Sequence, residues 1–175
     1  MRLFIALEFE ELSDYFKELQ EKIPKAKSTF PKKFHLTLKF LGEVDEKKVE
    51  EIKERLSKID FDSFKVKLGG TGVFPNEKFV RVVWAGVEDG EKITELQQKI
   101  EKSLEGLFKK DTRFHPHITL ARIKFIENDK KEEFIQGVKA IQVEPKETEI
   151  KNFKLVKSTL TPEGPVYEDL GVYGG

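Results

Sequence analysis

Hydrophobic positions along the chain follow two periods, and each period predicts one type of element. A continuous apolar run or a strict apolar–polar alternation is typical of a strand, whereas apolar residues that recur every three to four positions predict a helix. By these criteria we expect strands over 3–9, 34–41, 64–68, 82–87, 114–125, 149–160 and 166–172, and helices over 10–23, 45–59, 91–108 and 130–140.

Proline, glycine and capping residues set several of the expected boundaries. Pro24 ends the first helix, and Gly42 ends the second strand. Asp45 is suited to cap the second helix, because its carboxylate can accept hydrogen bonds from the first backbone N–H groups. The glycine-rich segment 69–72 lacks the Gly-Lys-Ser/Thr ending of a phosphate-binding loop, so we interpret it as a turn.

The order strand, helix, strand, helix, strand occurs twice, and the second copy begins near Arg81. Two copies predict a pseudo-twofold α+β fold, since a solenoid needs more units. Each of two lobes is expected to be a mainly antiparallel sheet with helices on its outer face, around a central groove. We expect residues 1–175 to form a single bilobal domain. Lobe 1 would span about 1–75 and lobe 2 about 80–160, and the last strands are candidates to cross between them.

Composition narrows the class of protein. Charged residues make up 37% of the chain, mostly Lys and Glu, a bias reported for thermophilic proteins. The absence of cysteine excludes disulfides, thiolate metal sites and a thiol nucleophile. Net charge is zero, so any nucleic acid must be bound by a local basic groove. The N-terminal apolar run is too short for a signal peptide and no stretch approaches bilayer length, so we expect a cytoplasmic protein without membrane contact.

The tetrapeptide His-x-Thr-Leu occurs twice, at 35–38 and 117–120. Successive side chains of a strand point to opposite faces, so each histidine is expected to share a face with its threonine while the apolar residues face the core. A single copy fits an ordinary half-exposed strand, and duplication alone could preserve two. Two copies at matched positions instead favour a shared site.

Two such strands meeting across a pseudo-twofold axis would direct two imidazoles and two hydroxyls at one tetrahedral group, such as a phosphodiester. Imidazole has an unperturbed pKa near 6.5, so one ring can donate a proton while the other accepts one. A five-membered cyclic phosphate is already strained, so we expect no metal and no other cofactor.

The chain resembles the two-histidine phosphoesterase superfamily, and within it the RNA 2′,3′-cyclic phosphodiesterase family, historically called 2′-5′ RNA ligases. The resemblance covers nearly the whole chain, and the segments that carry it are 1–7, 34–42, 81–87 and 116–122. It implies metal-independent hydrolysis of an RNA 2′,3′-cyclic phosphate to a 2′-phosphomonoester. It also implies the reversible joining of tRNA halves through a 2′-5′ linkage.

The resemblance further implies a role for each motif residue. His35 would donate a proton to the leaving 3′ oxygen, and His117 would accept one from water. Thr37 and Thr119 would hold the phosphate oxygens. Near-symmetry leaves the reverse assignment of acid and base open. The expected partner is RNA with a 2′,3′-cyclic phosphate end, such as tRNA halves or oligonucleotides, and the self-contained fold predicts a monomer.

Arg122 follows the second motif, and its guanidinium matches the geometry of a phosphate. Strict alternation would place Arg122 on the face opposite His117, so a phosphate-binding role requires the strand to bend or twist. A zinc site formed by His115, His117 and His35 is an alternative, but the repeated threonines have no purpose there. We therefore interpret His115 as a flanking or structural residue.

Two further features have two interpretations each. The segment 25–33 contains four lysines and no acid, so it either guides RNA, with Phe30 available for stacking, or is a solvated loop. Phe74 and Trp84 could stack on a base, but Trp84 lies in an apolar run and we assign it to the core.

The leading function is the cyclic phosphodiesterase. The alternatives are a non-catalytic RNA-binding module in the same groove and a zinc hydrolase.

Overall fold

The computed structural model describes residues 1–174. Within them the helices are α1 (Ser13–Glu21), α2 (Glu46–Ser57), α3 (Glu91–Ser103) and α4 (Lys131–Lys139), with 3-10 turns η1 (Glu10–Leu12) and η2 (Asn128–Lys130). The strands are β1 (Arg2–Glu8), β2 (Lys27–Thr29), β3 (His35–Glu43), β4 (Phe64–Asn76), β5 (Phe79–Glu88), β6 (Ile118–Phe125), β7 (Glu147–Ile150), β8 (Phe153–Thr161) and β9 (Gly164–Tyr173).

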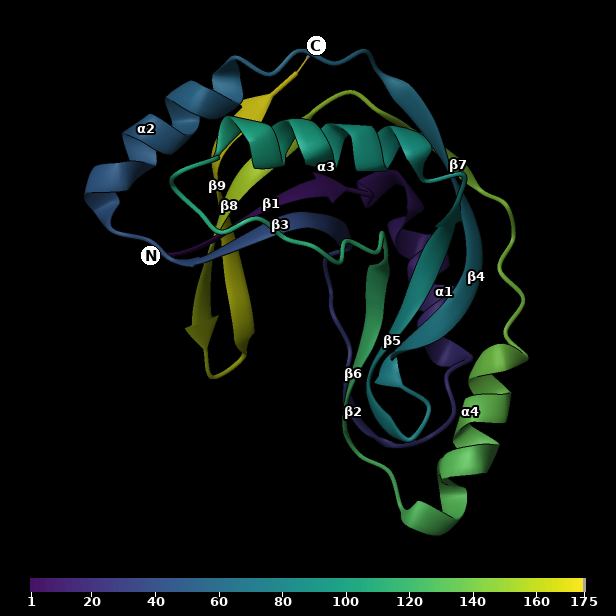
Figure 1. Ribbon diagram of the computed structural model, residues 1–175. Helices are drawn as coiled ribbons and strands as arrows, with labels where there is room; N and C mark the ends of the chain where they lie inside the picture. The colour runs from purple at the N-terminus through teal and green to yellow at the C-terminus, as the bar shows by residue number, and fades with distance from the viewer. Residues whose placement is uncertain (175) are drawn as a thin grey trace.

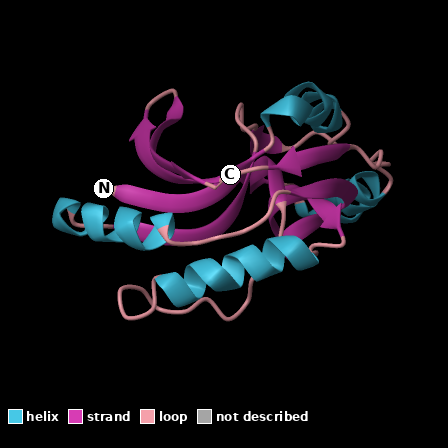
Figure 2. Cartoon of the chain, turned by 90° about the horizontal axis from the view of Figure 1, so that it is seen from above, coloured by secondary structure: helices cyan, strands magenta, loops and turns pink. Residues whose placement is uncertain are grey.

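The strands form one antiparallel sheet in the order β7-β4-β5-β6-β3-β1-β8-β9, and β2 pairs with β6 outside this order (Figure 1). The sheet has two halves, because β3 and β6 are paired only through Leu36 and Ile118. Figure 2 shows the helices outside the strand layer. The predicted α+β class with a mainly antiparallel sheet is confirmed.

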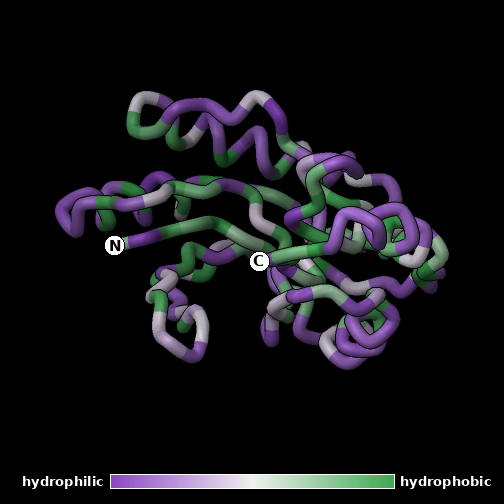
Figure 3. Tube along the Cα trace, turned by 90° about the horizontal axis from the view of Figure 1, so that it is seen from below, coloured by the Kyte–Doolittle hydropathy of each residue, from purple (hydrophilic) through white to green (hydrophobic). Residues whose placement is uncertain are grey.

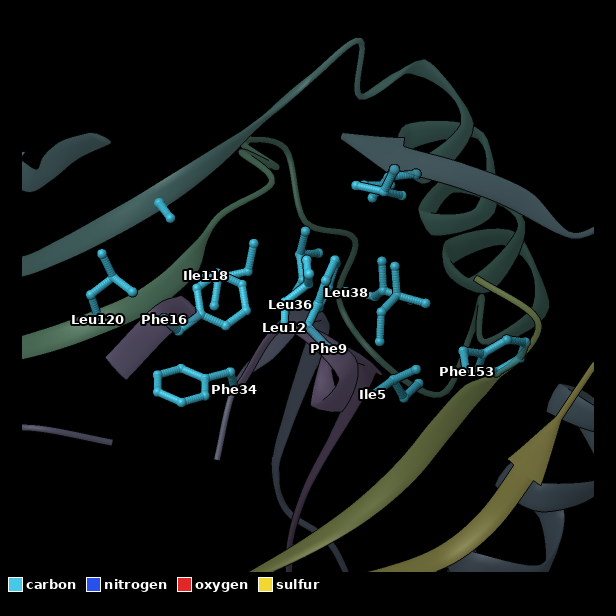
Figure 4. Close-up of a cluster of buried hydrophobic side chains, with 14 of the residues drawn as sticks. Ile5, Phe9, Leu12, Phe16, Phe34, Leu36, Leu38, Ile118, Leu120 and Phe153 are labelled. Atoms are coloured by element: carbon cyan, nitrogen blue, oxygen red, sulfur yellow. The ribbon is translucent and has the colours of Figure 1, made fainter. Parts of the chain in front are cut away.

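Each half supplies a helix that packs against the other half. The helix α1 follows β1 yet contacts β6, and α3 follows β5 yet contacts β3. One hydrophobic cluster consequently extends through both halves, and its members include the fully buried Leu7, Leu36, Val83 and Ile118. Figure 4 shows Leu36 and Ile118 in this cluster, and Figure 3 shows that hydrophobic residues follow the strands while hydrophilic ones dominate the helices.

Local sequence signals place several elements correctly. The carboxylate of Asp45 accepts a hydrogen bond from Lys47 N at 3.0 Å and caps α2, as predicted. The buried residues of α2 are the three apolar positions at helical spacing, Val49, Ile52 and Leu56. No helix among residues 1–174 combines the length and the apolar composition needed to cross a bilayer.

Other elements differ from the prediction, and the glycine-rich segment 69–72 is the clearest case. The strand β4 continues through it, so the predicted turn is wrong. Gly70 has φ +62 at a register shift between β4 and β5, where a bulge needs the left-handed conformation. A Cβ at Gly72 would overlap the ring of Trp84. These glycines therefore serve a bulge and a close approach within a strand.

The C-terminal region also departs from the prediction. The strand expected over 149–160 is two strands, because the chain leaves β7 at Ile150 and enters β8 at Phe153. The strand β7 pairs with β4 at one end of the sheet, whereas β8 pairs with β1 in the other half. The turn at 76–79, near the expected lobe boundary, joins β4 to β5 within one half.

Candidate active site

The two motif strands meet at the pair Leu36–Ile118, and this contact builds the site. Both side chains have an exposed fraction of 0% and anchor their strands in the core. Antiparallel register then sets His35 opposite Thr119, and Thr37 opposite His117. His35 and His117 are then diagonal neighbours across the strand pair. Such neighbours lie about 7–8 Å apart, which leaves room for a phosphate between the two rings. The structure thus brings together the four motif residues singled out from the sequence.

A β-bulge falls on the leucine of each motif. Between β1 and β3 the register passes from Ile5–Lys39 to Ala6–Thr37, which leaves Leu38 unpaired. Between β5 and β6 it passes from Val83–Ala121 to Trp84–Thr119, which leaves Leu120 unpaired. A bulge inserts one residue into a strand and shifts the alternation of the residues that follow. The repeat is therefore preserved at the level of backbone geometry as well as sequence.

The bulge determines where Arg122 points. Because Leu120 and Ala121 are both buried, Arg122 returns to the face of Thr119 instead of the opposite face. Its positive charge contributes to lowering the pKa of both His35 and His117, so its guanidinium lies near both rings. Strict alternation would have been misleading here, because the bulge supplies the bend that a phosphate-binding position of Arg122 requires.

His117 lies just before β6, so the expected strand over 114–125 begins later than predicted. Its Nδ1 is 2.7 Å from the backbone oxygen of His115. A carbonyl oxygen can only accept a hydrogen bond, so Nδ1 carries the proton and donates. In the neutral ring Nε2 is then left with a free lone pair.

The pKa of His117 lies below its ordinary value, chiefly because burial disfavours the charged ring, although the hydrogen bond to His115 acts in the opposite direction. The edge of the ring packs on Phe74, with ring centroids 4.8 Å apart. His117 is consequently neutral near pH 7 and restricted in orientation.

His35 is surrounded by aromatic rings. Phe4 lies against the imidazole with centroids 5.0 Å apart and an interplanar angle of 30°, and Tyr167 meets it edge-on at 5.5 Å. Burial lowers the pKa of His35 to about 4, and the charges of Arg122 and His117 contribute in the same direction. A bound phosphate would offset those charges and favour the protonated ring.

Trp84 lines a pocket beside His115 and does not belong to the core, so its assignment from the sequence is wrong. The side chain is half-buried, and its ring packs on Phe74 at 5.1 Å and on His115 at 5.0 Å. The neighbouring residues Val83 and Ala85 have exposed fractions of 0% and form the core side of β5. The apolar run concealed an alternation in which the largest residue faces outward.

The two motif threonines have half-buried side chains. Four other threonine hydroxyls, those of residues 71, 94, 148 and 161, donate to protein acceptors. Among residues 1–174 the hydroxyls of Thr37 and Thr119 make no such bond, so both are free to donate to a ligand.

The lysine-rich segment 25–33 flanks the site. Part of it forms β2, in which Thr29 pairs with Arg122, and Lys33 lines a cavity beside His35. Phe30 is 48% exposed. The position suits the predicted contact with an RNA strand, which stays a prediction.

Sequence reasoning missed two residues of the site, Phe4 and Tyr167. Phe4 lies in a run that predicts a buried strand, and nothing in that run shows that one of its faces lines a groove. Tyr167 reaches His35 only through the pairing of β9 with β8 and of β8 with β1. No local pattern signals that pairing.

His115 lies beside the site and contributes its backbone oxygen to it. Its ring centroid lies 6.4 Å from that of His117. Among residues 1–174 no group of three or more His, Asp or Glu side chains has the arrangement of a metal site.

Comparison with known proteins identifies similar sequences across the whole chain. The sequence profile of the family described as LigT like Phosphoesterase matches residues 6–84 and 86–167. The chain is 38% identical to an RNA 2′,3′-cyclic phosphodiesterase of Archaeoglobus fulgidus, over 99% of both chains. It is 40% identical to one of Methanocaldococcus jannaschii, over 96% of this chain and 97% of that protein.

Solved structures share the fold. A crystal structure of a protein from Thermus thermophilus superposes with a TM-score of 0.77 at 33% identity, covering 99% of this chain and 97% of that one. The E. coli LigT structure in complex with 3′-AMP gives a TM-score of 0.76 at 24% identity, with the same coverage, and supports the fold alone.

Proposed function

The chain belongs to the LigT-like phosphoesterase family and is an RNA 2′,3′-cyclic phosphodiesterase, and on this premise we propose that His35 and His117 are its proton donor and proton acceptor. The observation that carries the proposal is the pairing of Leu36 with Ile118. The two histidines and the two threonines are the residues on either side of this pair, so all four surround one point. General acid–base catalysis of this kind contributes about 10²–10⁴-fold to a rate.

In the proposed reaction, water attacks phosphorus on the side opposite the O3′ atom. Nε2 of His117 accepts the water proton as the new O–P bond forms. The P–O3′ bond breaks, its electron pair stays on O3′, and His35 supplies the proton that this oxygen takes up. The product carries a 2′-phosphate and a free 3′ hydroxyl.

Thr37, Thr119 and Arg122 are proposed to hold the non-bridging phosphate oxygens. Their hydroxyls and guanidinium are fixed donors in a partly buried site, where such donors stabilise developing charge without reorganising. The anion they bind would in turn favour protonation of His35, which the free protein holds neutral at pH 7. Substrate binding would thereby prepare the acid.

Finer details of the biological role belong to the same proposal. We expect RNA ends such as those of tRNA halves as substrates, and 2′-5′ joining as the parallel reaction in which a 5′ hydroxyl attacks phosphorus in place of water and O3′ leaves. A cysteine-free chain suits the reducing cytoplasm, and the shared hydrophobic cluster of the two halves suits a monomer.

One assay tests the proposal directly. An RNA oligonucleotide ending in a 2′,3′-cyclic phosphate is incubated with the protein in the presence of a strong chelator, and the product is separated by chromatography. We expect the 2′-phosphomonoester, and a fall in turnover of about 10²–10⁴-fold for His117→Ala with product binding retained. His115→Ala serves as matched control, because it keeps the backbone oxygen that orients His117, and we expect it to retain most of the turnover.

The competing functions predict other outcomes. An RNA-binding module would show no turnover and only a modest loss of affinity in His117→Ala. A zinc hydrolase would be inactivated by the chelator. A 3′-phosphomonoester product would contradict the assignment of O3′ as the leaving oxygen.

A further inference from the structure

The active site is flanked by a pocket that the proposed hydrolysis does not use. It measures about 430 Å³ and lies between the bulged part of β4, the end of β5, the start of α3 and the segment that leads to His117. We propose that this acceptor pocket binds the nucleoside whose 5′ hydroxyl attacks phosphorus in place of water, and so serves 2′-5′ joining. The inference rests on the function proposed above.

The lining of the acceptor pocket suits a neutral, flat group. The lining residues, all in the described part of the chain, include no Lys, Arg, Asp or Glu. Four of them are glycines, and the rings of Trp84 and His115 supply aromatic surface. By contrast, five charged side chains line the cavity beside His35. A phosphate would find no cation in the acceptor pocket, whereas a nucleobase would find a ring on which to stack.

The aromatic surface of the acceptor pocket continues to the proposed catalytic base. The ring centroid of Trp84 lies 5.0 Å from that of His115 and 6.3 Å from that of His117. The buried indole N–H of Trp84 has no hydrogen-bond acceptor among residues 1–174, so ring packing alone positions the indole. A base stacked on Trp84 would therefore stand one ring away from His117.

The pseudo-twofold relation of the two halves accounts for where the acceptor pocket lies. The strand β1, which carries Phe4 beside His35, pairs with β8, and β5, which carries Trp84 beside His117, pairs with β4. The cavity beside His35 and the acceptor pocket consequently occupy equivalent places in the two halves. Figure 1 shows β8 and β9 on one side of β3 and β6, and β4 and β5 on the other.

An in-line reaction needs space on both sides of phosphorus. If His35 supplies the proton that O3′ takes up, the ribose with the cyclic phosphate lies on the His35 side. The attacking oxygen then approaches beside His117, next to the acceptor pocket. A nucleoside held there keeps its 5′ hydroxyl close to phosphorus, and such positioning favours its attack over that of free water.

The joining step needs no group beyond those of the proposed hydrolysis. Nε2 of His117 accepts the proton of the 5′ hydroxyl while O5′ forms its bond to phosphorus. The P–O3′ bond breaks, its electron pair stays on O3′, and this oxygen takes up the proton that His35 supplies. The product is a 2′-5′ phosphodiester with a free 3′ hydroxyl, and no oxidant, reductant or further reactant takes part.

The first test measures joining against hydrolysis. Cytidine 2′,3′-cyclic phosphate is incubated with excess adenosine, and the 2′-5′ dinucleoside phosphate is separated from cytidine 2′-monophosphate by chromatography. We expect both products. As matched control, 5′-deoxyadenosine has the same base without the 5′ hydroxyl, so it should give no joined product and should inhibit joining to adenosine. Hydrolysis without joining in the presence of adenosine would overturn the proposal.

The second test fills the acceptor pocket. Thr94 lines it from the first turns of α3 with a half-buried side chain, so Thr94→Phe should occupy the space of the base. We expect the ratio of joining to hydrolysis to fall about tenfold or more, the effect of losing one stacked base. Hydrolysis should stay nearly unchanged, which also shows that the variant is folded. Thr159→Phe makes the same change at an exposed position of β8 and should keep the ratio. An unchanged ratio in Thr94→Phe would overturn the proposal.

Failure of the proposed function has a different signature, because no cyclic phosphate would then be hydrolysed. The single tryptophan of the chain still reports occupancy of the acceptor pocket in that case. Adenosine should quench the emission of Trp84, and ribose, which lacks a base, should not. In Thr94→Phe the half-saturating concentration of adenosine should rise about tenfold or more. Absence of quenching by adenosine would overturn the acceptor pocket, even in a protein that hydrolyses cyclic phosphates.

Discussion

At the scale of single residues, His35 has a low proton affinity in the free protein, although its proposed role as proton donor requires the protonated ring. Its pKa of about 4 in the free protein reflects burial against aromatic rings and the nearby charge of Arg122. His117 is shifted in the same direction, again mainly by burial. Both rings are therefore neutral at pH 7 before substrate binds, and the phosphate must help to protonate the acid.

These shifts predict the pH dependence of kcat/KM. The productive state has one ring protonated and the other neutral, so the rate falls when both lose their protons and when both gain them. Because both pKa values lie below 6.5, we expect a bell-shaped profile with its maximum below pH 6.5. Initial rates measured from acid to mildly alkaline pH record it, and a flat profile would contradict paired-histidine catalysis.

The variant Arg122→Gln tests the direction in which the charge of Arg122 shifts the pKa values of the two histidines. Removing a neighbouring positive charge stabilises protonated imidazole, so the pKa of both His35 and His117 should rise toward 6.5. An NMR titration of the ring Cε1–H signals measures this without turnover. Unchanged titration curves would show that the guanidinium of Arg122 does not lie near the two imidazole rings.

Gly72 is required by the ring of Trp84 that lies over it. Gly72→Ala is expected to displace that ring, and with it the aromatic surface that includes Phe74 and His117. Trp84 is the single tryptophan of the chain, so its fluorescence emission reports the displacement directly. An unshifted spectrum would mean that the backbone of β4 yields instead.

At the scale of elements, a buried ion pair ties the first motif strand to the segment that leads to His117. Nζ of Lys39, in β3, contacts Glu101 Oε1 at 2.8 Å and the backbone oxygen of Lys109 at 2.9 Å. Glu101 Oε2 accepts from Asp111 N at 3.3 Å. The side chains of Lys39 and Glu101 are 2% and 6% exposed, so neither charge is solvated.

Breaking this pair should destabilise the protein strongly. Lys39→Met leaves the Glu101 carboxylate buried without its partner, at a cost of about 3–5 kcal/mol in the free energy of unfolding. The double variant Lys39→Met with Glu101→Met should recover most of that loss. Lys53→Met removes a surface pair with Glu50 and should cost at most about 1 kcal/mol. Denaturant titration measures all three, and equal losses in Lys39→Met and Lys53→Met would contradict the assignment.

At the scale of the whole molecule, the two halves are built from interleaved parts of the chain. The strand β1 is paired on one edge with β3 and on the other with β8, and the last segment of the chain thereby completes the first half. The main hydrophobic cluster also runs through both halves. The halves are consequently expected to fold together.

A fragment comprising residues 1–152 tests this interdependence. Without β8 and β9, the buried strand β1 becomes an open edge, and the completely buried side chains of Phe153 and Leu155 are lost. We expect no cooperative thermal transition by circular dichroism. A fragment that melts cooperatively would show that an early lobe folds by itself.

Much of the fold was predictable because local periodicity encodes it. The apolar stripe of α2 with its cap at Asp45 and the paired His-x-Thr-Leu motifs are properties of neighbouring residues. For the proposed site, the repeat singled out His35, Thr37, His117 and Thr119, and the pairing of the two motif strands brings these residues together.

The sequence by itself determined most of the elements and singled out the four paired residues, since both follow from spacing along the chain. Only the tertiary structure decided that Leu36 pairs with Ile118, that a bulge turns Arg122 toward the histidines, and that Tyr167 covers His35. The physical reason is that strand pairing and bulges depend on hydrogen bonds between segments far apart in the chain. Neither hydrophobic period carries information about them.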